Sequence, residues 1–110
     1  MGRRIPTPDE FPGLAARFRA LSDPTRLELL TLLHEGEHTV TSLVTRTGQG
    51  QANVSKHLQQ LHAQGFVSRR RAGLFAFYRL ADRQVMRLCA QMLDRTDDGA
   101  GLVAERSAPG

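Results

Sequence analysis

A switch from helical to strand-like periodicity, between residues 67 and 80, limits the folds that this chain can adopt. Before and after this stretch, apolar side chains recur at the spacing of α-helices. Within it, two runs of strand-forming residues, Val67–Arg71 and Leu74–Leu80, flank Ala72 and Gly73, which predicts a β-hairpin. We therefore expect a mainly α-helical protein with one β-hairpin.

Capping residues predict three helices in the first half of the chain. The first helix is expected from Glu10 to Leu21. Asp23, followed by a proline, is an N-cap for a second helix that Gly36 ends. Thr39 caps a short third helix, and Gly48 closes it.

A fourth helix is predicted from Gln51 to Ala63, directly after the glycine-containing segment 47–50. Two short helices joined by such a turn are typical of a helix-turn-helix. Asp82 can cap a last helix behind the hairpin. This order of helices and hairpin predicts a winged helix-turn-helix.

The chain length fits one such domain. With 40% hydrophobic and 24% charged residues, we expect a globular domain over residues 10–95, a flexible arm at 1–9 and a flexible tail at 96–110. The longest mostly apolar stretch, Leu27–Leu33, is too short to cross a membrane. The N-terminus does not resemble a secretory signal, so we expect a cytoplasmic protein without a membrane partner.

The distribution of charge predicts a nucleic-acid partner. No aspartate or glutamate occurs between Glu37 and Asp82, whereas this stretch carries six of the 15 arginine and lysine residues. A segment without carboxylates suits a surface that faces phosphates. A chance gap in an arginine-rich composition would look the same, so this prediction needs support from the fold.

The predicted fourth helix carries short polar side chains that can read bases. Glutamine and asparagine can pair with adenine in the major groove, while lysine and serine can reach guanine or phosphate. A solvated helix face would have a similar composition, but the arginines of the adjacent hairpin favour DNA binding. The candidate DNA-binding residues are Gln51, Ala52, Asn53, Ser55, Lys56, Gln59, Arg69, Arg70 and Arg71.

Three motifs follow one another in a specific order: LSDPTRLELL at 21–30, NVSKHL at 53–58, and GFV at 65–67 with RAG at 71–73 and YRL at 78–80. Together they resemble the ArsR/SmtB family of bacterial repressors over about Phe11 to Met92. The resemblance implies a homodimer that represses transcription from a double-stranded DNA operator. It adds His57, in the recognition helix, and Gly73, at the wing tip, to the candidate DNA-binding residues.

The first and last predicted helices each carry a stripe of apolar side chains, and these two stripes predict a dimer independently of the family resemblance. A core of three short helices cannot cover both stripes, and exposed they would exceed the apolar patch of a typical monomer. Pairing of the first and last helices would bury them and place two recognition helices about one DNA turn apart. The candidate interface residues are Phe11, Leu14, Phe18, Val85, Leu88, Cys89 and Met92.

The resemblance also identifies the positions at which many relatives bind metal, and this sequence lacks the ligands. Thr39 and Thr41 occupy the thiolate positions, and threonine is no ligand for a soft metal. The second familiar site falls on Asp82, Gln84, Arg95 and Asp98, two carboxylates without histidines. We expect no metal site and no cofactor.

Other functions remain open. A ligand- or redox-responsive sensor would use Cys89, the single cysteine, or an unrecognised site. A winged helix can also serve as a protein-interaction module without DNA. We do not expect an enzyme, because no nucleophile–base set, phosphate loop or paired carboxylates are recognisable.

Overall fold

The computed structural model describes residues 4–95. A 3₁₀ turn and four helices precede a two-stranded hairpin, a further short strand lies between the second and third helices, and residues 85–95 form another helix, called here the C-terminal helix. The bounds are η1 Pro8–Glu10, α1 Phe11–Leu21, α2 Pro24–Glu35, β1 His38–Thr39, α3 Val40–Thr47, α4 Gln51–Ala63, β2 Val67–Ala72 and β3 Phe75–Leu80. The helix and hairpin predictions are confirmed to within a residue or two.

Local signals in the sequence explain where the helices begin and end. The Asp23 carboxylate accepts a hydrogen bond from the Arg26 backbone N–H at 3.0 Å and caps α2. The Thr39 hydroxyl accepts one from the Ser42 backbone N–H at 3.1 Å and caps α3. Gly48, with φ of 74°, ends α3 in the left-handed conformation that glycine adopts without strain.

The sheet contains one strand that the sequence did not predict. Its order is β1-β3-β2, all antiparallel, and β1 pairs His38 with Tyr78 and Thr39 with Phe77. The hairpin turn also lies one residue later than expected. Ala72 still pairs with Phe75, so the turn is formed by Gly73, with φ of 63°, and Leu74.

The core lies between α2, α3, α4 and the sheet. Val54, Leu58 and Leu61 of α4 are buried as predicted, against four leucines of α2. Val85, at the start of the C-terminal helix, is only 2% exposed and belongs to this core. The prediction that Val85 faces a second subunit is therefore wrong, because its side chain is already covered within one chain.

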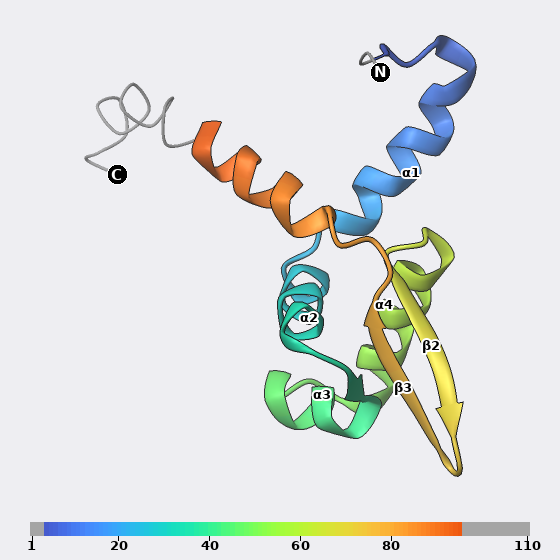
Figure 1. Ribbon diagram of the computed structural model, residues 1–110, viewed down its shortest axis with the longest axis vertical. Helices are drawn as coiled ribbons and strands as arrows, with labels where there is room; N and C mark the ends of the chain where they lie inside the picture. The colour runs from blue at the N-terminus through green and yellow to red at the C-terminus, as the bar shows by residue number, and fades with distance from the viewer. Residues whose placement is uncertain (1–3, 96–110) are drawn as a thin grey trace.

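Helix α1 and the C-terminal helix project from the end of the molecule opposite the hairpin tip (Figure 1). Only Ala20 of α1 is buried. Exposed apolar side chains on these two helices are Phe11, Leu14, Phe18, Leu88, Met92 and Leu93. Within residues 4–95, no helix is long and apolar enough to span a membrane.

Candidate nucleic-acid interface

Helix α4 presents a polar face to solvent. Gln51, Ala52, Asn53, Lys56 and Gln59 are exposed, whereas Ser55 is half-buried. The turn before α4 is ordered by polar contacts: the Gln49 side-chain carbonyl accepts a hydrogen bond from the Asn53 amide at 2.8 Å. The exposed amides, lysine and small alanine at the start of α4 could approach base edges.

His57 does not share this exposed face. Its side chain is 14% exposed, and its Nδ1 lies 3.0 Å from Nη1 of Arg26. Arginine only donates hydrogen bonds, so His57 Nδ1 acts as the acceptor. The His57 imidazole thus packs mainly between α4 and α2, and its assignment to the DNA-binding face stays a prediction.

The register of the hairpin separates its arginines onto two faces. Directly paired residues lie on the same face of an antiparallel ladder. Arg69 pairs with Tyr78, and Arg71 pairs with Ala76, so both point to the face that carries the buried core residues. Arg70 pairs with Phe77 and points to the opposite face.

Arg70 is engaged by an acidic residue of the same chain. Its Nε and Nη2 each donate a hydrogen bond of 2.9 Å to the Glu37 carboxylate, and its guanidinium lies 4.7 Å from the centre of the Phe77 ring. The hydrogen bonds from Arg70 lower the pKa of Glu37 below its usual range. The Glu37 carboxylate thus offsets the charge of Arg70.

Arg69 and Arg71 are exposed, and no carboxylate within residues 4–95 forms an ion pair with either of them. Their charges are therefore not offset by a carboxylate from this part of the chain. The sequence alone did not distinguish them from Arg70, because the partner Glu37 lies 33 residues away and is brought close by pairing of β1 with β3.

The tip of the hairpin is apolar. Leu74 is 92% exposed and Phe75 is 59% exposed, next to the turn glycine Gly73. Arg71, the last of the three adjacent arginines, lies on β2, before the turn. The sequence predicted that Leu74 begins the second strand, because leucine fits a strand, whereas the pairing of Ala72 with Phe75 places Leu74 in the turn.

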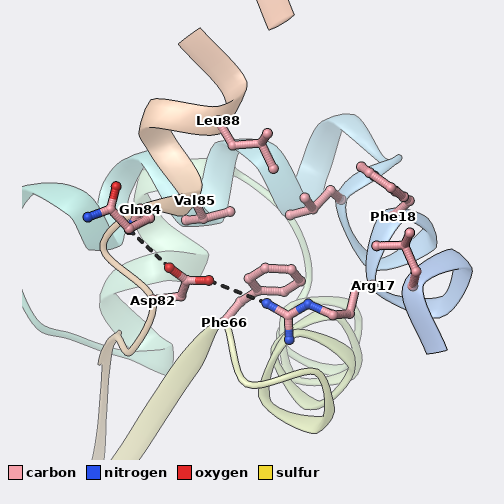
Figure 2. A pocket seen from close by; sticks show the side chains of 9 residues that line it. Arg17, Phe18, Phe66, Asp82, Gln84, Val85 and Leu88 are labelled. Atoms are coloured by element: carbon pink, nitrogen blue, oxygen red, sulfur yellow. Dashed lines mark hydrogen bonds and ion pairs between the residues drawn. The ribbon is translucent and has the colours of Figure 1, made fainter. Parts of the chain in front are cut away.

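Thr39 and Asp82, which stand at the two positions where many relatives bind metal, make other contacts in this structure. Residues 4–95 contain no group of three or more histidine, cysteine, aspartate or glutamate side chains that could hold a metal ion. Thr39 serves as a helix cap. Asp82 accepts hydrogen bonds from the Gln84 backbone at 3.0 Å and from Arg17 at 3.3 Å (Figure 2), and Asp98 lies outside the described residues.

Cys89 lines an apolar groove of about 530 Å³ between α1, α2 and the C-terminal helix. Its neighbours along the groove include Leu27, Leu88 and Leu93. The side chain is half-buried, and burial raises the pKa of its thiol. A raised pKa lowers the fraction of reactive thiolate, which disfavours an oxidation sensor.

Comparison with known proteins identifies similar regulators. Residues 23–69 match the model of a family described as "bacterial regulatory protein, arsR family". A probable mercury resistance operon repressor from Streptomyces lividans is 41% identical over 107 residues, which cover 94% of this chain and 84% of that protein. The transcriptional regulator Rv0324 of Mycobacterium tuberculosis is 37% identical over 90 residues, 82% of this chain but only 40% of that longer protein.

A solved structure has the same architecture. It is the solution structure of the homodimeric winged helix-turn-helix DNA-binding domain Mb0332 from Mycobacterium bovis. Its TM-score is 0.74 at 33% identity, and the match covers 89% of this chain and 91% of that one.

Proposed function

The chain belongs to the ArsR family of bacterial regulatory proteins, and from this premise we propose that it represses transcription as a homodimer bound to a pseudo-palindromic operator. The observation that carries the proposal is the exposed polar face of α4 beside Arg69 and Arg71, in a stretch without acidic residues. Because the target is bacterial DNA, the place of action would be the cytoplasm.

In this proposal α4 enters the major groove and the hairpin follows the backbone. Gln51 and Asn53 would read base edges, and Lys56 would reach guanine or phosphate. Arg69 and Arg71 would contact phosphates, which fix the register without reading the sequence. The hairpin tip, with Leu74, would lie beside the neighbouring groove.

The dimer would form through α1 and the C-terminal helix, within a domain that spans residues 10–95. A second copy would cover the exposed side chains of both helices and the groove beside Cys89. Compared with the interface residues predicted from the sequence, the proposed interface includes the exposed Leu93 and omits the buried Val85. The proposed interface contains Phe11, Leu14, Phe18, Leu88, Cys89, Met92 and Leu93.

We further propose that neither familiar metal site controls this repressor. Thr39 and Thr41 offer no thiolate, and Asp82 is held by Arg17. Zinc, cadmium and arsenite should each leave the protein bound to its operator in a titration. Release by one equivalent of any of these ions would contradict this part of the proposal.

The central test begins with selection of bound duplexes from a random DNA pool by the purified dimer. We expect two related half-sites, and binding to the selected duplex should weaken steeply as salt rises, because counterions are released at each phosphate contact. Failure to enrich any sequence, or an affinity that does not depend on salt, would contradict DNA binding as the function and favour a protein-interaction module.

A further inference from the structure

Arg17 of α1 joins three elements at one point. Its Nη1 donates a hydrogen bond of 2.6 Å to the Gln64 carbonyl at the end of α4, and its Nη2 donates one of 3.3 Å to the Asp82 carboxylate. Its guanidinium carbon lies 4.4 Å from the centre of the Phe66 ring. Figure 2 shows Arg17 reaching across Phe66 to Asp82, with Val85 and Leu88 of the C-terminal helix beside them.

Arg26 of α2 makes a second junction on the same helices. Its Nε and Nη2 donate hydrogen bonds to the carbonyls of Ala20, at 2.7 Å, and Arg19, at 3.0 Å, both in the last turn of α1. Its Nη1 bonds to His57, at 3.0 Å, and to the Gln60 side chain, both on α4. One guanidinium therefore links the end of α1 to the middle of α4.

Apolar contacts alone do not fix the orientation of α1 against α4. Ala20 is the one buried residue of α1, Leu21 is partly buried against the core, and Phe11, Leu14 and Phe18 are exposed. Apolar contact is non-directional, whereas a guanidinium presents its donors in a rigid planar fork. Arg17 and Arg26 therefore supply the directional side-chain contacts between α1 and α4.

We propose that Arg17 and Arg26 are positioning residues that set the separation of the two α4 helices in the dimer, and hence the spacing of operator half-sites that the protein accepts. The inference rests on the proposed function. Since the partner is reached through α1 and the C-terminal helix, any rotation of α1 against α4 is repeated by the two-fold symmetry. One base pair corresponds to a shift of only about 3.4 Å along DNA.

The test uses the full chain and a series of duplexes in which the selected half-sites are moved apart or together by one base pair. Wild type should lose about tenfold in affinity or more at each altered spacing, because the DNA must be deformed to fit. The double variant Arg17→Lys with Arg26→Lys keeps the charge and loses the planar fork. It should lose only about threefold or less at altered spacings.

Two internal controls separate positioning from general damage. The ratio of affinities for two spacings does not depend on the fraction of folded protein, and the preference among bases within a half-site should stay unchanged, because α4 keeps its reading face. Arg19→Lys, at an exposed position of α1, should keep the wild-type spacing preference.

A milder variant covers the case in which the double variant does not fold. Asp82→Asn keeps an oxygen for the Gln84 N–H and removes the charge that holds Arg17, so it should relax the spacing preference at least about twofold. An unchanged spacing preference in the folded double variant, or in Asp82→Asn if only that variant folds, overturns this inference alone. Failure of wild type to select any duplex overturns the proposed function and this inference with it.

Discussion

The body of the molecule, from α2 to the hairpin, and its two projecting helices differ in how far their large apolar side chains are buried. Apart from the hairpin tip, with Leu74 and Phe75, the body encloses most of them: Leu29, Leu30, Leu43, Leu58 and Leu61 are fully buried. On α1 and the C-terminal helix, large apolar side chains remain exposed, with Phe18 at 49%. The body has its own core, whereas the projecting helices present surface that a second copy would cover.

This difference separates two quantities that a single stability measurement would combine. Folding of the body depends on burial within one chain, and dimerisation depends on burial between two chains. DNA binding needs both, because two recognition helices must act together. Each substitution below acts on one region and should spare the other.

The largest effect is expected at the proposed interface. Phe18→Glu places a carboxylate on the apolar stripe of α1, where the partner would have to desolvate it. We expect monomers by analytical ultracentrifugation and a loss of operator affinity of roughly 100-fold or more, since the two half-sites no longer cooperate. The circular dichroism spectrum should be retained.

The matched control for this variant is Ile5→Glu, another exposed apolar residue changed to the same acid outside both stripes. It should stay dimeric and keep its operator affinity. Dimerisation of Phe18→Glu at the wild-type strength would contradict the division between the two regions.

A core substitution should act on the body. Leu58 is fully buried on α4, and Leu58→Ala should lower the free energy of unfolding by about 3 kcal/mol through lost burial and the cavity left behind. Leu74→Ala, at the hairpin tip and 92% exposed, should cost about 1 kcal/mol or less. Urea unfolding at one fixed protein concentration compares the two, and equal losses would speak against a closed core.

Within the proposed DNA-binding region, substitutions of the residues assigned to base reading and of those assigned to phosphate contact should have different effects. Asn53→Ala should relax the preference for one base in the half-site, lowering the difference in binding free energy between the preferred and a competing base by about 1–3 kcal/mol. Arg71→Ala should weaken binding to all duplexes alike, by about tenfold, and lower the salt slope by about 1.

Arg70→Ala is the matched control for the hairpin, because Glu37 already binds Arg70. It should weaken operator binding clearly less than Arg71→Ala does. If all three substitutions change affinity and preference in the same way, the assignment of roles on α4 and the hairpin is wrong.

The smallest effect is expected at Cys89. Cys89→Ser should weaken the dimer by about 1 kcal/mol, because a hydroxyl is placed in the apolar groove. Since burial raises the pKa of the thiol, mild oxidation should leave operator binding by wild type unchanged. Operator binding is measured before and after oxidation. Loss of binding in wild type but not in the serine variant would make Cys89 a sensor.

Local sequence signals predicted much of the fold. The caps Asp23 and Thr39 and the glycine at 48 placed helix ends correctly, and the apolar spacing of Val54, Leu58 and Leu61 gave the buried face of α4. Each of these signals depends on residues a few positions apart in the chain. The exposed polar face of α4 followed from the same periodicity.

Contacts between distant residues required the tertiary structure. The sequence shows three adjacent arginines, but only the pairing of β1 with β3 brings Glu37 to Arg70 and leaves Arg69 and Arg71 without an acidic partner in residues 4–95. It likewise shows Val85 on an apolar stripe, but only packing decides that a side chain on that stripe is already buried. Sequence patterns at short range determine which face a helix or strand offers, whereas packing determines which residue from elsewhere in the chain meets it.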